Sequence, residues 1–330
     1  MATPPPTKIL LLGAGELGTA LLAHLVPLPN THLTIALRNP TNHPTLSTTY
    51  PGTSLIPLDL TSPSPTLVQT FSTYDIIVSA TGFSQAGGGS LLKLTREILE
   101  AGQLRREKNA TGAAEARLWY FPWQWGVDYD VTGDGHGLMP LFGEQKQVRD
   151  LLRGYASACS VRWTIVSTGI FMSFLFEKFW GVVERENRVE GVGEIDVQIH
   201  GTITVRALRD WSHKVTVTDV DDIGKVLACI LKGDVEAENR VVYAAGDTVS
   251  YAELADIVEK VTGRKVEREE WSVPYLEEEL EKDPDNQIKK YRLVFARDGV
   301  WWDKKGTVNE KLGIKVMDVE SYVHNWVERK

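Results

Sequence analysis

The segment from Leu141 to Leu152, LFGEQKQVRDLL, places a glutamine and a lysine side by side where acid–base chemistry could occur. A lysine can exchange a proton, whereas the amide of Gln145 can only donate and accept hydrogen bonds near neutral pH. One residue on an α-helix is a rotation of about 100°, so Gln145 and Lys146 cannot both point into one cleft. Both are candidate catalytic residues, and the helix face on which each lies decides which of them can reach the active site.

The spacing of apolar residues assigns these two side chains to different faces. Gln145 belongs to a buried stripe whose other members are Leu141, Val148 and Leu152. Lys146 lies on a mostly polar face that it shares with Phe142, Arg149, Asp150 and Arg153. Asp150 stands four residues after Lys146, which is the spacing of an ion pair. We therefore expect Gln145 to face the substrate and Lys146 to be solvated.

A glycine-rich turn, GAGELG, follows an apolar strand and precedes a helical segment. The first glycine permits the tight turn, the second lets the backbone approach a pyrophosphate, and the third lets helix and strand pack closely. This context predicts dinucleotide binding. The residues of the turn that would contact the cofactor are Gly13, Gly15, Glu16, Leu17 and Gly18.

The residue that ends the second strand indicates which dinucleotide binds. An acid there would bind the ribose hydroxyls of NAD, but here the strand ends in Arg38, whose guanidinium can pair with a 2′-phosphate. No other Lys or Arg occurs between residues 39 and 60. The sequence therefore predicts NADP. Asp59 ends the third strand, where its carboxylate could meet the adenine amine or simply cap the loop.

These motifs need a parallel sheet to position them. Strand-like runs at 8–12, 33–38 and 162–169 alternate with helical segments such as 16–26 and 91–102, which is typical of βαβ units. We predict an α/β fold, a Rossmann-type doubly wound parallel sheet over 1–169. A smaller α+β substrate domain is expected over 170–330, with part of 213–245 packing back on the Rossmann domain.

Several segments resemble one family: KILLLGAGELG, IIVSATG, FPWQWGVDYD, VRWTIVSTGIF and VTVTDVDDIGKVLA. With them the chain resembles, over nearly its whole length, the NmrA-like and isoflavone reductase-like atypical short-chain dehydrogenases, which include phenylcoumaran benzylic ether and pinoresinol reductases. The resemblance implies an NADPH-dependent reductase acting on aromatic compounds in a cleft between two domains. We expect the nicotinamide to lie in a site bounded by Thr81, Gly82, Phe83, Phe121 and Pro122.

The sequence departs from this family in three places. The relatives' glycine loop, usually GATGxxG, is one residue shorter here. Where they read FPSEFG, this chain has Trp123, Gln124 and Trp125, so a carboxylate is lost. In the relatives a lysine on the following helix is assigned proton transfer, and its place is taken by Gln145. We therefore expect a substrate that is already electrophilic, such as a quinone methide, enone or iminium.

Aromatic residues past the fifth strand and after residue 169 predict a pocket for a flat, apolar ligand. Its expected members are Trp123, Trp125, Phe171, Phe174 and Trp180. His136 could contact a substrate, although a lone loop histidine is more often merely exposed. The loop DYDVTGDGHGLM begins like a calcium-binding loop, but its twelfth residue is Met139 instead of glutamate, so we expect a polar active-site loop and no metal.

Composition excludes other function classes. A net charge of −8 and a pI near 5.5 disfavour nucleic-acid binding. Cys159 and Cys229 are the only cysteines and form no metal or disulfide pattern, which fits a reducing cytoplasm. No apolar run approaches the ~20 residues needed to span a membrane, and no signal peptide is predicted. The sequence leaves open whether the protein forms a homodimer.

The leading hypothesis is an NADPH-dependent reductase of a small aromatic or alkaloid-like secondary metabolite, with hydride transfer to an activated electrophile. One alternative is an NmrA-like regulatory protein that binds NADP without turnover, which the missing lysine and glutamate favour. Another is a non-redox isomerase, dehydratase or pericyclase on the same fold.

Overall fold

The apolar runs of the first half of the chain form one seven-stranded parallel sheet. The computed structural model describes residues 5–82, 90–108, 117–185 and 202–328. The strands are β1 (Thr7–Leu12), β2 (Thr31–Leu37), β3 (Ser54–Pro57), β4 (Ile76–Ser79), β5 (Leu118–Phe121), β6 (Val161–Ser167) and β11 (Arg240–Tyr243), in the order β11-β6-β5-β4-β1-β2-β3. The order reverses direction between β1 and β4, which is where α/β sheets open a crevice for a ligand.

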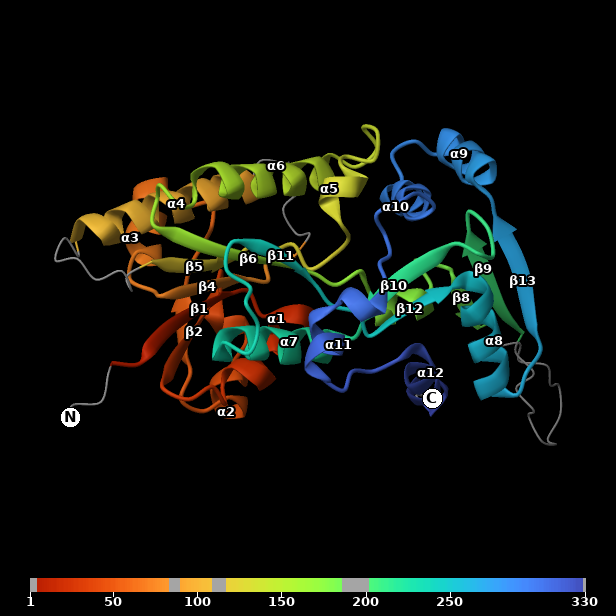
Figure 1. Ribbon diagram of the computed structural model, residues 1–330, viewed down its shortest axis with the longest axis horizontal. Coiled ribbons are helices and arrows are strands. Elements are labelled where there is room, and N and C mark those ends of the chain that lie inside the picture. The colour runs from red at the N-terminus through yellow and green to blue at the C-terminus, as the bar shows by residue number, and fades with distance from the viewer. Residues whose placement is uncertain (1–4, 83–89, 109–116, 186–201, 329–330) are drawn as a thin grey trace.

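Helices cover both faces of this sheet (Figure 1). On one face lie α1 (Glu16–Leu25) and α7 (Val220–Lys232), and on the other lie α3 (Ser64–Phe71), α4 (Ser90–Lys108) and α6 (Pro140–Tyr155). Strand residues alternate between the two cores: Ile9 and Leu11 pack with α1 and α7, whereas Leu10 and Leu12 pack with the other three helices. This is the α/β fold of Rossmann type that the sequence predicted.

The later part of the chain contributes one strand, β11, to the large sheet. Strand β11 pairs in parallel with β6, and the helix before it, α7, packs against α1 through a glycine, Gly224, whose added Cβ would lie 2.4 Å from His24 Cδ2. Asp219 caps α7, with its side chain accepting a hydrogen bond from the Asp221 N–H. Elements from both halves of the sequence therefore build the first core.

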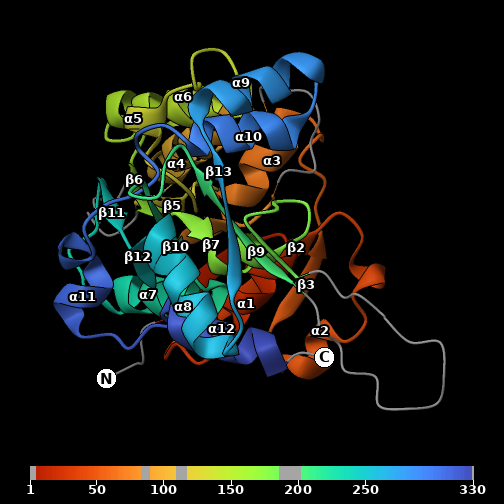
Figure 2. The same cartoon turned by 90° about the vertical axis from the view of Figure 1, so that its right-hand side faces the viewer.

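The remaining elements form what we call the smaller lobe, at the right of Figure 1 and toward the viewer in Figure 2. One small sheet joins β7 (Ile170–Phe171), β10 (Lys214–Thr218) and β12 (Asp247–Ser250); the other joins β8 (Val183–Arg185), β9 (Ile203–Leu208) and β13 (Val266–Trp271). Around them lie α8 (Tyr251–Thr262), α9 (Val273–Lys282), α10 (Gln287–Phe295) and α12 (Val319–Glu328). Short elements complete the fold: η1 (Pro40–Asn42), α2 (Leu46–Thr49), α5 (Tyr129–Thr132), η3 (Met172–Phe176), η4 (Lys304–Gly306) and α11 (Val308–Leu312).

The lobe has a separate apolar core. Its buried members include Leu175, Trp180, Val205, Val217 and Leu254. Within the described residues, no helix is both long and apolar enough to cross a membrane. The two cores meet where β6 runs directly into β7, so residues 168–176 lie at the boundary between the lobe and the large sheet.

Candidate functional site

The glycine turn between β1 and α1 is shaped by close backbone contacts. Gly13 has φ +94°, and a Cβ there would lie 2.8 Å from the Ala80 carbonyl oxygen. A Cβ at Gly18 would lie 2.3 Å from the carbonyl oxygen of Gly13. At Gly15, an added Cβ would meet no described atom within 4 Å. The first and third glycines are therefore required by packing, whereas the second leaves open space in front of the helix.

The amino end of α1 suits an anion. Gly15 is its N-cap residue, and no side chain in the described part of the chain caps it. Unpaired N–H groups and the helix dipole at such an end favour a phosphate. Leu17 is buried in the core beneath, so it can offer a ligand only its backbone N–H.

A groove of about 200 Å³ extends from this turn along the carboxyl ends of the strands. Its lining residues come from β1 to β4 and the segments that follow them, namely Leu12, Gly13, Ala36, Leu37, Arg38, Leu58, Leu60 and Thr81. Arg38 is exposed at the end of this groove, where its side chain can reach a ligand phosphate. The apolar walls and the terminal guanidinium suit an adenine ring and a phosphate.

Asp59 has a local role. Its Oδ1 accepts hydrogen bonds from the Thr61 N–H, at 2.9 Å, and the Thr61 hydroxyl, at 2.8 Å. These bonds, followed by the charge of Arg38, lower the pKa of Asp59. Asp59 thus caps the turn after β3, which is the second of the two roles expected from the sequence, and one carboxylate oxygen is committed to that turn.

Thr81, directly after β4, lines the groove on the side away from β3, and the described lining includes no residue of β5. Thr81 Oγ1 lies 3.4 Å from Ser79 Oγ, and Gly82 has φ +70°. Phe121 and Pro122 are buried at the end of β5. Of the residues expected to border the nicotinamide, Thr81 lines the groove, and Gly82, Phe121 and Pro122 are not among its lining residues. Phe83, expected there too, lies outside the described residues.

Glu16 introduces negative charge beside the phosphate turn. Burial raises the pKa of this carboxyl, and the charges of Glu177 and Asp219 raise it further, while a hydrogen bond with Ser173 lowers it. Ser173 and Glu177 belong to the segment that leads into the smaller lobe, so this segment lies beside the start of α1, where Gly15 and Glu16 are exposed. An ionised Glu16 would oppose a pyrophosphate at the same helix end.

Gln145 and Lys146 lie on different faces of α6, as their spacing predicted. Gln145 is 2% exposed, and its Nε2 donates a hydrogen bond of 2.7 Å to the carbonyl oxygen of Trp123. Lys146 is solvated, and its Nζ lies 2.8 Å from Asp150 Oδ2, which confirms the expected ion pair. Gln145 therefore holds the segment after β5 in place, and the Gln124 side chain returns a bond of 2.8 Å to the Gln145 carbonyl oxygen.

The expectation that Arg149 lies on a polar face is wrong. Arg149 is 0% exposed, and its guanidinium donates to Gln124, Asp128, Asp130 and Ser167 at 2.8 to 3.0 Å. Phe142, assigned to the same face, is also buried. The buried side of α6 is wider than the sequence indicated. Residues 122–130 cover it at Arg149, and Phe142 packs against Tyr129 and Tyr291 in the core of the smaller lobe.

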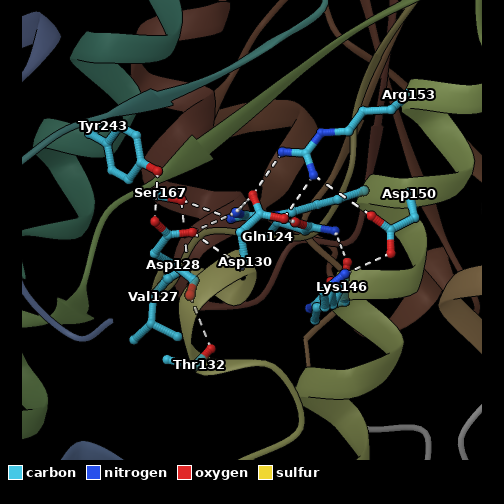
Figure 3. Close-up of polar contacts among 12 residues, drawn as sticks. Gln124, Val127, Asp128, Asp130, Thr132, Lys146, Asp150, Arg153, Ser167 and Tyr243 are labelled. Atoms are coloured by element: carbon cyan, nitrogen blue, oxygen red, sulfur yellow. Dashed lines mark hydrogen bonds and ion pairs between the residues drawn. The ribbon is translucent and has the colours of Figure 1, made fainter. Parts of the chain in front are cut away.

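Figure 3 shows this network running from Tyr243 of β11 to Arg153 of α6, and it is buried at Gln124 and Ser167 but exposed at Arg153. The Tyr243 hydroxyl donates to Asp128 Oδ2 at 2.8 Å, and burial, with the Asp128 carboxylate, raises the pKa of Tyr243 to about 12. Asp130 accepts two bonds of 2.7 Å from Arg153. Hydrogen bonds from Arg153, and then from Arg149, lower the pKa of Asp130. The loop that begins like a calcium site thus has its first two carboxylates bound to arginines.

The predicted aromatic residues are distributed over several places. Phe171 and Phe174 are partly buried and in contact, with ring centroids 5.6 Å apart, and Phe174 contacts Phe179 at 5.4 Å. Phe179 is 46% exposed and was not predicted from the sequence. Since Ser173, within this segment, contacts Glu16, the aromatic row lies beside the phosphate turn.

The other predicted substrate contacts lie elsewhere. Trp125 is 7% exposed, and its indole N–H donates to the Ser79 carbonyl oxygen at 2.9 Å, so it braces the ends of β4 and β5. Trp180 is buried in the core of the smaller lobe against Phe295, with ring centroids 5.3 Å apart. His136 is exposed in the loop before α6, with φ +60°. Trp123 is half-buried beside Gln145.

Glu144 is a further buried residue that sequence reasoning missed. Its Oε1 accepts the Leu91 and Leu92 N–H groups, at 2.8 and 3.0 Å, and so caps α4 from another helix. The only sequence signal for these residues is their position beside the buried Gln145. Glu144 stands one residue before it, and Arg149 stands about one helical turn after it. That signal is weak, because polar residues at the margin of an apolar stripe are usually solvated.

We expect Gly15→Ala to leave the stability within about 0.5 kcal/mol of the original, because its methyl group enters open space and its φ of −74° suits alanine. The same methyl group should weaken NADPH binding about fivefold, by preventing close approach of a phosphate. Thermal unfolding and calorimetric titration measure the two effects. Gly154→Ala, on α6 and equally uncrowded, is the control for binding and should leave NADPH affinity unchanged, although alanine in a helix should raise stability by about 0.5–1 kcal/mol. Unchanged NADPH affinity in Gly15→Ala would contradict the assignment of the turn.

The sheet order, the glycine turn and the groove at the switch point define an α/β protein of the dinucleotide-binding class. Residues 5–323 match the NmrA-like family, and the chain belongs to that family. An NmrA-like family domain-containing oxidoreductase of Gibberella moniliformis is 36% identical over 96% of this chain and 97% of its own length.

Solved structures share the fold at low sequence identity. An isoflavone reductase matches with a TM-score of 0.71 at 18% identity, covering 97% of this chain and 99% of its own. An NADPH-dependent quinone oxidoreductase of Escherichia coli, complexed with NADPH, matches with a TM-score of 0.69 at 16% identity, with the same coverage.

Proposed function

We propose that this protein is an NADPH-dependent reductase of a small aromatic or alkaloid-like secondary metabolite, acting on a carbon that is already electrophilic. The observation that carries the proposal is the groove that joins the glycine turn to Arg38. The aromatic row Phe171, Phe174 and Phe179 supports it, because Ser173, in the same segment, contacts Glu16 at the start of α1. The oxidoreductase name of the Gibberella relative and the NADPH in the Escherichia coli structure support it.

The residues present fit a phosphorylated dinucleotide. Gly15 leaves space for the pyrophosphate at the amino end of α1, and Arg38 would pair with the 2′-phosphate. When bound, the reduced dinucleotide supplies a hydride equivalent. The ends of β4 and β5, with Thr81 and Pro122, would border the nicotinamide.

The chain's own residues supply positioning more than proton transfer. The Gln145 amide, engaged with the Trp123 carbonyl, cannot act as an acid or base near neutral pH. Lys146 is turned toward Asp150 and solvent. We therefore infer that the substrate is activated before it binds, as an enone, iminium or quinone methide is, and that water or the substrate itself provides the proton.

Titration calorimetry with NADPH and NADH, followed by NADPH oxidation assays with a quinone and an aromatic enone, tests the proposal. Micromolar NADPH binding with oxidation supports a reductase. Binding without oxidation of either electrophile supports the second candidate, a dinucleotide-dependent regulatory protein. That candidate is favoured because Gln145 replaces the family's lysine and its amide is bonded to the Trp123 carbonyl oxygen. Absence of binding by both nucleotides rejects both.

Gln145→Ala is expected to lower NADPH oxidation about tenfold with little change in the NADPH dissociation constant, since it frees the segment that holds Trp123. Lys146→Ala should stay within about twofold of the original rate, because it removes only a surface ion pair. Steady-state kinetics and calorimetry on both variants give the comparison. The reverse pattern would show that Lys146 serves the reaction and that our assignment of helix faces is wrong.

Glu16 should make NADPH binding depend on pH. Because its pKa is raised, the carboxyl keeps its proton to a higher pH than an ordinary glutamate, and on ionising it repels the pyrophosphate. We expect the NADPH dissociation constant to rise, relative to that of Glu16→Gln at the same pH, as pH increases through the raised pKa of Glu16, above the ordinary value of 4.5. Glu16→Gln should therefore bind NADPH more tightly than the original protein above that pKa; Glu100→Gln, an exposed acid on α4, is the control. Weaker binding by Glu16→Gln would contradict the repulsion.

A further inference from the structure

A second and larger cavity, of about 550 Å³, lies at the other edge of the large sheet. Tyr243, at the end of the edge strand β11, forms one wall, together with Asp128. The segment after α10 forms the other with Asp298, Trp301, Trp302 and Asp303. The groove that ends at Arg38 lies at the ends of β1 to β4, whereas this cavity lies beyond β6.

A filled wall separates this cavity from the dinucleotide groove. The segment after β5 runs along the ends of the strands: Trp125 bonds to Ser79 of β4, the Gly126 carbonyl accepts from Thr168 and Gly169 after β6, and Asp128 reaches Tyr243 of β11. Behind Asp128 lies the fully buried Arg149. A ligand in the cavity would therefore meet the outer side of this wall.

The aromatic walls are fixed in place before any ligand binds. The Tyr243 and Trp302 rings are 5.0 Å apart at 66°, and the Trp302 indole N–H donates to the Ala244 carbonyl oxygen at 3.1 Å. Gly299, with φ +89°, accepts a backbone bond of 3.0 Å from Asp128, which ties the two walls together. Rigid aromatic surfaces of this kind bind flat ligands with little loss of entropy.

The charged groups that line the cavity are acidic. Its described lining includes Asp128, Asp298 and Asp303 and no lysine or arginine. The balancing cations lie behind or beside the wall: Arg149 is buried beneath Asp128, and Arg209 pairs with Asp298 at 3.3 Å. Trp301 is 42% exposed, and Lys214 Nζ lies 5.4 Å from its ring centroid, so a ligand cation must bind at the remaining exposed surface of this ring or displace Lys214.

We propose that this cavity is a binding site for a flat organic cation, a protonated or quaternary amine attached to an aromatic ring, separate from the dinucleotide groove. Aromatic faces attract a cation and pack against its ring, and the carboxylates at the rim complement its charge. The site goes beyond the proposed reductase function and stands whether or not the protein reduces a substrate.

Calorimetric titration with three probes of one ring system tests the proposal: tryptamine as the cation, tryptophol as the neutral alcohol and indole-3-propionate as the anion. We expect tryptamine to bind about tenfold more tightly than tryptophol, and the anion to bind more weakly still. Tryptamine affinity should be the same with saturating NADPH as without it. Competition between tryptamine and NADPH, equal affinity for cation and anion, or no tryptamine binding at millimolar concentration would each overturn the proposal.

Variants locate the site. Trp301→Ala should weaken tryptamine about tenfold, whereas Tyr155→Ala, which removes another exposed aromatic ring at 60% exposure, should have no effect. The double variant Asp298→Asn with Asp303→Asn should reduce tryptamine affinity about fivefold and leave tryptophol binding unchanged; asparagine can still cap η4 at position 303. Identical tryptamine affinity in all these variants would place the cation elsewhere and overturn the assignment.

Discussion

Arg149→Met is expected to lower the free energy of unfolding by about 3–5 kcal/mol, because it leaves the buried amide and hydroxyl of Gln124 and Ser167, and two partly buried carboxylates, without their donor. The lost partners are Asp128 and Asp130, with Gln124 and Ser167. Methionine fills much of the volume but donates no hydrogen bond. Chemical denaturation followed by circular dichroism measures the loss, and a change below about 1 kcal/mol would show that the network contributes little.

Two comparisons separate burial from charge in this network. Arg153→Met removes the other arginine of Asp130, but Arg153 is 43% exposed, so a loss of about 1 kcal/mol or less is expected. Arg149→Lys keeps the charge and loses the forked geometry, and should fall between the two. If Arg149→Met is too unstable to purify, the order of Arg149→Lys and Arg153→Met still tests the idea: Arg153→Met must be the more stable.

The network should also affect stability in acid. Arg153 and Arg149 hold the pKa of Asp130 below its ordinary value, so its contribution to stability is fully present above pH ~4 and is lost as pH falls toward the lowered pKa. In Arg149→Met the pKa of Asp130 should rise part of the way back to the ordinary value of an aspartate. The stability of that variant should consequently fall less steeply between about pH 4 and pH 2 than that of the original protein.

Arg38→Ala should raise the dissociation constant for NADPH about 10- to 100-fold and leave that for NADH within about twofold, because the lost bonds go only to the 2′-phosphate. Arg38 is the arginine that lines the groove, and it stands at the carboxyl end of β2. The experiment is calorimetric titration of both nucleotides at one ionic strength. Arg240→Ala, which removes an exposed arginine at the opposite edge of the sheet, should alter neither affinity.

Equal weakening of NADPH and NADH by Arg38→Ala would remove the argument for a 2′-phosphate contact while leaving the glycine turn as a pyrophosphate site. The same conclusion would follow if Gly15→Ala lost binding of both nucleotides while Arg38→Ala still preferred NADPH to NADH. The glycine turn would then be a pyrophosphate site, and Arg38 would not contact the 2′-phosphate. The two substitutions therefore test separate ends of the groove, since Gly15 lies at the start of α1 and Arg38 beyond the end of β2.

The family and its fold were readable because their signals are local. The glycines of the first turn are needed where strand, helix and the next strand approach within van der Waals distance, as the contacts of Gly13 and Gly18 show. The alternation of Ile9 to Leu12 between two cores follows from the pleat of a strand, and the cap at Asp219 from the free N–H groups of a helix end. Each of these requirements involves neighbours in sequence or a fixed period.

The sequence by itself thus determined the parallel sheet, the glycine turn between its first strand and helix, the arginine at the end of β2 and the separate faces of Gln145 and Lys146. Only the tertiary structure decided that Arg149 is buried, that Trp180 and Trp125 are packing residues, and that Phe179 joins Phe174. The reason is physical: a guanidinium can be buried only where several acceptors surround it, and its acceptors here lie 18 to 25 residues away in the chain. The spacing of residues within α6 therefore cannot predict that these acceptors lie next to Arg149.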